Sequence, residues 1–452
     1  MKIPAWIRTN PVLPWAALFL AVNLFVTQYG AVNALSRFAE LRAITERHTL
    51  RIDAYGDWTI DWARAPDGHL YSNKAPGPVL LGLPMFALTD LFVLPFAPKD
   101  SLQRAPEPTY WQHLLLMLWL QLIPAMGLVL YASRRLLERG ADPAAVHFFA
   151  LAALFGNTAA AYMNSNFGHG VASLLFLGAA LAWWDQRYAW TGLLLGASLL
   201  SDYGVAFALP FFILATAWRE RRWRALVEIG VGATPPALVW IWYHVTCFGS
   251  PFRTANQFTN PTQIETLPGR ANLWGEYSPF PSPSVVGDLL FGSSRGLLVT
   301  QPWMFGVLAL PFLRRRERGL ALLAVGSLGG LLWMNGGFGG WHGGWCIGPR
   351  YLSVVFLAMA FALAASWGST PRWLRTLMWA GLAVALGFRF ISYPFSNLAP
   401  VTPLWPYFTD NLLNPEHRGT KVLRLALAVL SSSAAAFWVY RRRRIPFLRN
   451  PV

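Results

Sequence analysis

Charged residues are scarce in this chain. Only 13% of its 452 residues are Asp, Glu, Lys or Arg, whereas 55% are hydrophobic, and the mean hydropathy is +0.37. This balance excludes a soluble globular protein, because several apolar runs approach the roughly 20 residues that cross a bilayer. The composition therefore predicts a polytopic membrane protein.

Cysteines and clustered metal ligands are also scarce. The two cysteines, Cys247 and Cys346, both fall on the side of the membrane predicted below to be outer. An oxidising compartment would permit a disulfide there, but two free or buried thiols are favoured. The eight histidines form no H-x-x-x-H or paired-cysteine ligand set. Metal binding is thus left unknown, and a divalent cation is expected only if the carboxylates of Asp53, Asp57 and Asp61 converge.

Several enzyme signatures are missing as well. No Gly-rich phosphate loop follows a strand and no Ser-His-Asp signature occurs, which argues against nucleotide hydrolysis, acyl transfer and a nucleotide-sugar donor. No internal repeat, coiled coil or soluble domain is visible, so residues 1–452 are predicted to form one transmembrane domain. Beyond that conditional cation, no cofactor is expected.

What the chain does contain is a series of apolar runs. They predict about twelve transmembrane helices, over residues 12–29, 111–131, 144–162, 171–184, 189–201, 205–218, 225–247, 296–313, 319–335, 351–367, 377–395 and 422–440.

The net charge of +16 is concentrated in the short connections between these runs. That distribution is the positive-inside pattern of an inner-membrane protein with both termini in the cytoplasm, and it argues against a nucleic-acid partner. Residues 30–110 and 248–295 then form long outer loops. The basic residues assigned to the inner side are Lys2, Arg8, Arg134, Arg135, Arg139, Arg187, Arg219, Arg221, Arg222, Arg224, Arg314, Arg315, Arg316, Arg318, Arg372, Arg375, Arg441 to Arg444 and Arg449.

One further apolar segment, residues 78–97, complicates this topology. Counting it as a span would place Arg134 and Arg135 outside and invert the orientation of everything after it. Its prolines, Pro78, Pro84 and Pro95, favour a helix that lies on or dips into the outer leaflet.

The first long loop carries two polar motifs. One runs from Ile52 to Trp62 and includes Asp53, Asp57 and Asp61, and the other reads Gly-His-Leu-Tyr-Ser-Asn-Lys-Ala-Pro over residues 68–76. In order and spacing they resemble the first outer loop of the GT-C membrane glycosyltransferases, particularly the group of protein O-mannosyltransferases and the lipid A aminoarabinose transferase. This chain departs from that pattern with Ala54, Ile60 and Ala75 in place of Glu, Gly and Pro.

The resemblance implies an all-α polytopic fold with surface helices in its first outer loop. It also implies an enzyme that moves a sugar from a polyprenyl-phosphate donor to a lipid, glycan or protein acceptor at the outer face. Such a reaction needs a carboxylate to take the acceptor's proton and cations to stabilise the departing phosphate. Asp53 is the expected base and Asp61 a second catalytic acid. The expected phosphate ligands are Lys74, Arg350 and Arg295, the last two in weakly similar Arg-Gly-Leu and Arg-Tyr elements.

Other outer residues are weaker candidates for binding substrate, each with an ordinary structural alternative. Asp202 lies near membrane depth, where an acid is costly, but it could be a polar turn. Neither Glu265 nor Glu276 is singled out by its spacing. The substrate-binding candidates are Tyr71, Asp57, His69, His169, Asp202, Tyr203 and His342.

Three rival functions remain open from the sequence. A secondary transporter or a flippase of a lipid-linked saccharide would be expected to have discontinuous helices and ionisable groups at mid-membrane. A non-catalytic lipid-binding protein would need no outer carboxylate. An enzyme like the O-antigen ligases would also use polyprenyl-linked sugars on the outer side. Membrane lipids are expected partners of this chain.

Overall fold

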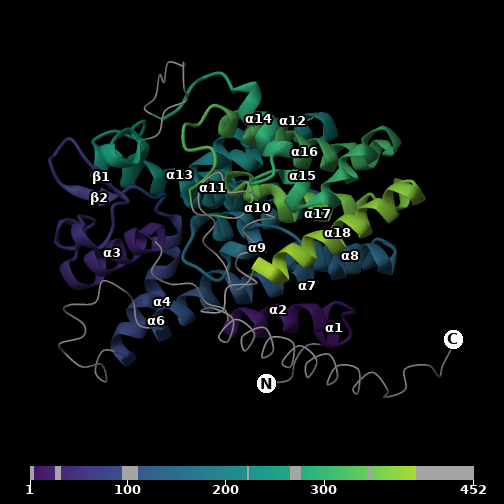
Figure 1. Cartoon of the computed structure of the whole chain (residues 1–452), viewed down its shortest axis with the longest axis horizontal. Coiled ribbons are helices and arrows are strands. Elements are labelled where there is room, and N and C mark those ends of the chain that lie inside the picture. Colours follow the sequence, from purple (N-terminus) through teal and green to yellow (C-terminus); the bar gives the residue numbers. More distant parts are fainter. Residues whose placement is uncertain are drawn as a thin grey trace.

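The computed structural model describes residues 5–25, 32–93, 110–220, 223–264, 276–344, 346 and 348–392. The predicted span at 422–440 lies outside these residues. So do Lys2, the C-terminal arginines Arg441 to Arg444 and Arg449, and the loop residues Arg221, Arg222 and Glu265. The described part is mostly helical, as expected (Figure 1).

The N-terminal third consists of helices around a small hairpin. Helices α1 (Ala5–Arg8) and α2 (Leu13–Phe25) come first, followed by α3 (Val32–Arg47) and the 3-10 helix η1 (Asp53–Trp58). Strands β1 (Trp62–Arg64) and β2 (Leu70–Ser72) pair antiparallel, with Trp62 opposite Ser72. The apolar helix α4 (Gly77–Val93) packs against α3 and against α6 (Tyr110–Met117). In Figure 1, α3, the hairpin, α4 and α6 occupy the left and lower left of the molecule, whereas α1 and α2 lie along its lower edge.

The remaining elements form the main helical bundle. In chain order they are η3 (Leu118–Leu122), α7 (Ile123–Glu138), α8 (Pro143–Leu154), α9 (Ala159–Tyr162), α10 (Gly168–Trp184), α11 (Tyr188–Ser201), η4 (Tyr203–Phe207), α12 (Leu209–Glu220), α13 (Trp223–Phe248), η5 (Ala255–Gln257), η6 (Pro261–Gln263), α14 (Pro283–Phe291), α15 (Leu297–Thr300), η7 (Pro302–Phe312), α16 (Arg315–Gly336), η8 (Arg350–Val355), α17 (Phe356–Ala365), η9 (Trp367–Ser369) and α18 (Arg372–Ser392).

Three helical stretches in the described residues are long and apolar enough to cross a membrane: Trp111–Glu138, Trp223–Phe248 and Glu317–Gly336. Other apolar helices, including α2, α4, α8, α10 and α11, are shorter. The membrane character of the chain is therefore supported, while the number of crossings stays a prediction. The segment expected at the outer leaflet is α4, and Pro84 lies inside this helix.

Among the described residues, the predicted spans 144–162 and 296–313 are interrupted by local signals. In the segment 144–162, Asn157 donates to the carbonyl of Ala153 (2.9 Å) and accepts from the Ala160 amide (3.1 Å). Such local side-chain bonds compete with the helical ladder, and α8 and α9 are separate helices here. In the segment 296–313, α15 ends at Thr300 and η7 starts at Pro302, which has no N–H to continue the preceding helix.

Helix α10 is the central helix of the bundle. Nearly all of its residues are buried, and it packs against α11, α17, η8 and α7. Its first turn contains His169 and its last residue is Trp184. At a rise of 1.5 Å per residue, those two positions are about 22 Å apart. The two ends of this helix belong to two different groups of side chains.

Candidate functional site

Helix α3 places an arginine inside the protein. Its residues Ala34 to Ala43 are all buried, including Arg37, Glu40 and Arg42. The Arg37 guanidinium donates to the carbonyl oxygens of Asn33 and Asn166 (3.1 Å each). It reaches the first turn of α10, where a Cβ on Gly168 would be 2.9 Å from Arg37 Nη2. Glycine at 168 therefore leaves room for this cation.

The hairpin brings an acid and a lysine together. Because Trp62 pairs with Ser72, the residues flanking the two strands, Asp61 and Lys74, become neighbours. Lys74 Nζ lies 3.0 Å from Asp61 Oδ2, and the two side chains are only 18% and 13% exposed. Ser36 Oγ on α3 donates to the Asp61 carbonyl oxygen (2.5 Å), which holds the hairpin against that helix.

The pKa values of both members of this pair are lowered. Burial by itself would raise the pKa of Asp61, but the nearby cations of Lys74, Arg350 and Arg37 bring it below its usual value. Burial lowers the pKa of Lys74 despite the opposing effect of Asp61. Burial also lowers the pKa of Arg37 to about 10, so Arg37 stays a cation at neutral pH.

A third cation, Arg350, comes from the start of η8. Its Nη2 donates to the Tyr351 hydroxyl (2.9 Å), and its guanidinium carbon lies 4.8 Å from the centre of the Tyr351 ring and 5.9 Å from that of Phe167. Gly343 covers the Arg350 side chain with a backbone φ of +72°, and a Cβ there would lie 3.0 Å from Arg350 Cγ. Both the conformation and the close approach favour glycine.

A histidine and an aspartate complete the group. His169 Nδ1 in the first turn of α10 lies 2.6 Å from Asp202 Oδ2 at the end of α11, and both side chains are largely buried. The Asp202 carboxylate also accepts from the Gly204 amide (2.9 Å). The His169 ring packs edge-on against Tyr351 at 5.5 Å between centroids. This contact joins the pair to Arg350.

Together these side chains form one charged cluster, which we call the cation cluster: Arg37, Asp61, Lys74, His169, Asp202 and Arg350. Its members come from α3, the hairpin, α10, the α11–η4 junction and η8, and electrostatic interactions link Arg37 to Asp61, Asp202 and Arg350. Three permanent or near-permanent cations face two carboxylates. Such a group can bind an anion such as a phosphate ester, and it offers a carboxylate beside it.

Several predicted site residues lie apart from the cation cluster. Asp53 is 45% exposed and accepts from His69 Nδ1 (3.1 Å) and the Leu70 amide (3.0 Å). Asp57 is exposed on η1. The Tyr71 hydroxyl donates to Asp67 (2.9 Å).

The positions of Tyr203 and Arg295 point to structural roles. The Tyr203 hydroxyl lies 3.0 Å from His244 Nε2. Arg295 is fully buried, and its guanidinium donates to the carbonyls of His342, Gly344 and Ser294. These bonds order the Gly-rich loop after α16, which has little intrinsic order in sequence. The expected phosphate-binding role of Arg295 and the substrate role of His342 stay predictions, and the geometry favours loop positioning for both.

The described residues contain no group of three or more His, Cys, Asp or Glu side chains placed to hold a metal ion. The carboxylates of Asp53 and Asp57 do not join Asp61. Cys247 and Cys346 are free thiols in this structure, and each is buried. A cavity of about 580 Å³ opens beside the hairpin, between α3, α4 and α13.

Sequence reasoning missed Arg37 altogether. The charge pattern places residues 32–47 in an outer loop. An arginine and a glutamate three residues apart on this stretch are the one local signal for a polar face turned inward. One partner of Arg37, the carbonyl oxygen of Asn166, lies 129 residues away in sequence. No local sequence pattern indicates that contact.

No family model and no curated protein matches this chain. Among solved structures it is similar to the crystal structure of ArnT from Cupriavidus metallidurans bound to undecaprenyl phosphate. The match covers 96% of this chain and 76% of that one, with 14% sequence identity and a TM-score of 0.48. At this level of likeness the function has to be argued from the side chains themselves.

Proposed function

We propose that this chain is a membrane glycosyltransferase of the GT-C kind that transfers a sugar from a polyprenyl-phosphate carrier to an acceptor hydroxyl or amine. The observation that carries the proposal is the burial of Asp61 among Lys74, Arg37 and Arg350. The choice of carrier rests on this cluster and on the resemblance of the first loop. The acceptor is a lipid, a glycan or a protein, and the active site faces the outer side of an inner membrane.

In the proposed reaction the acceptor oxygen or nitrogen attacks the anomeric carbon of the donor sugar. The new glycosidic bond forms as the bond between that carbon and the phosphate oxygen breaks. Asp61 receives the acceptor's proton, and the polyprenyl phosphate leaves with the electron pair. Lys74, Arg350 and Arg37 stabilise the charge that develops on the phosphate.

The donor itself would activate the base. Without ligand, Lys74 holds the pKa of Asp61 down. A phosphate that pairs with Lys74 competes for this cation and adds a negative charge nearby, so the effect of burial, which raises the pKa, would then prevail. Asp61 would become a stronger base only when the donor is bound. In this proposal Asp61 replaces Asp53 as the base, because Asp53 lies apart from the cations.

The His169–Asp202 pair has a supporting role in this proposal. With Nδ1 turned to Asp202, the ring would keep Nε2 available to contact the sugar or the phosphate. We therefore keep both residues as substrate-binding candidates.

Donor binding by the purified protein tests the proposal. Lys74→Met and Arg350→Met should each weaken binding of undecaprenyl phosphate by about 2–5 kcal/mol, which is more than tenfold. Arg253→Met, which removes an exposed arginine of the second long loop, is the matched control and should leave the affinity unchanged. Unchanged affinity in both cluster variants would overturn the proposal. Translocation of a lipid-linked sugar across vesicles without sugar transfer would favour the flippase instead.

A further inference from the structure

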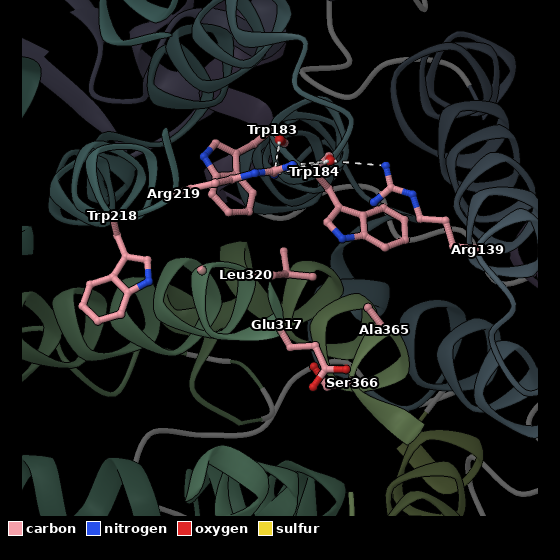
Figure 2. A pocket seen from close by; sticks show the side chains of 10 residues that line it. Arg139, Trp183, Trp184, Trp218, Arg219, Glu317, Leu320, Ala365 and Ser366 are labelled. Carbon is pink, nitrogen blue, oxygen red and sulfur yellow. Dashed lines mark hydrogen bonds between the residues drawn. The ribbon is translucent and has the colours of Figure 1, made fainter. Parts of the chain in front are cut away.

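A second charged site lies at the opposite end of α10. A cavity of about 570 Å³ opens there between α10, α12, α16 and the end of α17 (Figure 2). A neighbouring cavity of about 310 Å³ shares part of its wall. Both lie about one helix length from the cation cluster. The shared wall consists of Arg139, Trp184, Glu317 and Ala365.

Two arginines of the larger cavity are stacked on tryptophan rings. The Arg139 guanidinium carbon lies 3.6 Å from the centre of the Trp184 ring, and that of Arg219 lies 4.8 Å from the centre of the Trp183 ring. Arg219 donates to the Trp183 carbonyl (3.1 Å) and Arg139 to the Trp184 carbonyl (3.3 Å), as the dashed lines in Figure 2 show. Stacking and the carbonyls of the last turn of α10 fix the two cations in place. Arg139 also pairs with Asp185 (2.8 Å) and Arg219 with Glu220 (3.4 Å), two acids that are not among the residues lining the cavities. A guanidinium has five N–H donors, so each arginine keeps donors for a further anion.

Among the residues that line the two cavities, positive charge exceeds negative charge. Their arginines are Arg139, Arg219, Arg314 and Arg375, and their carboxylates, among the residues the structure describes, are Asp142 and Glu317. Both acids already have backbone partners. Asp142 caps α8 by accepting from the Ala144 amide (2.8 Å), and Glu317 accepts from the Arg314 amide (2.9 Å). An anion entering here would therefore meet stacked arginines and acids that are already hydrogen-bonded.

The surroundings suit a lipid rather than a soluble anion. Trp218, which lines the larger cavity, and Trp223 are strongly exposed. Tryptophan gathers at membrane–water interfaces. The arginines here are also among the basic residues that the charge pattern assigns to the cytoplasmic side, and basic pockets between transmembrane helices on that side bind anionic lipid headgroups.

We infer that this arginine–tryptophan site binds the phosphate headgroup of an anionic phospholipid in the leaflet opposite the sugar-transfer site. The lipid phosphate pairs with Arg219 and Arg139 in the larger cavity, and Arg375 adds charge from the neighbouring one. Binding stabilises the ends of α10, α12 and α16 together. The inference does not depend on the proposed transferase activity, because it concerns the other end of the bundle.

The test is a titration of the purified full-length protein in a zwitterionic detergent, followed by its thermal unfolding temperature. The probes are short-chain phosphatidylglycerol, phosphatidylcholine of the same chain length, and inorganic phosphate. Phosphatidylglycerol should raise the unfolding temperature in a saturable way, since a ligand of the folded state stabilises it by mass action. The other two probes should have little effect. Equal effects of the two lipids, or an equal effect of inorganic phosphate, would overturn the inference.

Variants of the cavity arginines test where the lipid binds. Arg219→Gln and Arg375→Gln should each weaken the phosphatidylglycerol effect by about tenfold or more, through loss of a charge-assisted contact. Arg224→Gln is the matched control, because its side chain is 85% exposed and pairs only with Glu228 in the described structure. Equal weakening in the control would mean general surface attraction and would contradict the site. If one of the two cavity variants does not fold, the other variant still tests the site. The comparison of phosphatidylglycerol with phosphatidylcholine on the wild-type protein tests it as well.

Discussion

The buried pair of Asp61 and Lys74 gives the sharpest prediction on the unliganded protein. Its charges are 3.0 Å apart and mostly shielded from water, and removing one partner of a buried pair leaves an uncompensated charge that costs about 3–5 kcal/mol. The two substitutions should not destabilise the protein equally. Lys74→Met leaves Asp61 with Arg37 and Arg350 nearby, whereas Asp61→Asn leaves three cations close together. Asp61→Asn should therefore be the more destabilising, at about 3–5 kcal/mol.

The double variant measures the coupling between the two residues. Because each single change removes the same ion pair, the double variant should be less destabilised than the sum of the singles, by about 1–3 kcal/mol. The assay is reversible unfolding in mixed micelles, with Arg253→Met as a surface control. Additive effects within about 0.5 kcal/mol would refute the coupling on which this account of the site depends.

Stabilisation of these variants by undecaprenyl phosphate then distinguishes a phosphate-binding site from an ion pair with only a structural role. In Asp61→Asn, undecaprenyl phosphate can supply the missing negative charge, so it should stabilise this variant more than the wild type. It should stabilise Lys74→Met less than the wild type, because a phosphate partner is gone. The same stabilisation in all three proteins would mean that the phosphate binds elsewhere.

Other predictions concern neighbouring residues. Gly343→Ala should lower the rate of sugar transfer much more than Gly344→Ala. Both glycines have a positive φ, so alanine costs roughly 1 kcal/mol of backbone strain at either position, but only the methyl group at position 343 would crowd Arg350. Equal losses of transfer in the two variants would contradict this packing. Burial raises the pKa of Glu40 to about 8, so its contribution to stability is complete below about pH 4.5 and is lost as the pH rises through 8. Glu40→Gln should therefore flatten the dependence of the unfolding free energy on pH across that window. An unchanged slope would show that Glu40 does not cause this pH dependence. Arg295→Met should reduce stability and loosen the Gly-rich loop to proteolysis with little change in donor affinity, whereas a selective loss of affinity would restore its predicted phosphate role.

The sequence predicted the elements that carry the site better than the pairing of its residues. The spacing of the first-loop motifs singled out Asp61 and Lys74, and the Arg-Tyr element singled out Arg350. Which carboxylate faces the cations depends on the hairpin register, since Asp61 flanks β1 whereas Asp53 lies before it on η1. A single chain gives no signal for that register until the strands are paired.

Tertiary contacts account for the other differences. The Arg37 side chain reaches from α3 to the start of α10, and this contact joins residues far apart in the chain. The Arg295 side chain orders the Gly-rich loop through its hydrogen bonds. Arg295 lies outside this loop in the sequence, so the composition of the loop does not indicate that it is ordered. Pro302 is a local signal for the break between α15 and η7. The high hydropathy of the whole segment nevertheless favours one continuous span in the sequence-based prediction.

Single-turnover sugar transfer by Asp61→Asn and Asp53→Asn tests the central claim most directly. Asparagine keeps the size of the side chain but cannot accept the acceptor's proton, so Asp61→Asn should transfer sugar from a polyprenyl-phosphate donor about 10²–10⁴-fold more slowly with donor binding retained. Asp53→Asn should react at nearly the wild-type rate, because its carboxylate lies apart from the cation cluster. Near-normal transfer by Asp61→Asn, with Asp53→Asn inactive, would contradict the account and return the role of base to Asp53.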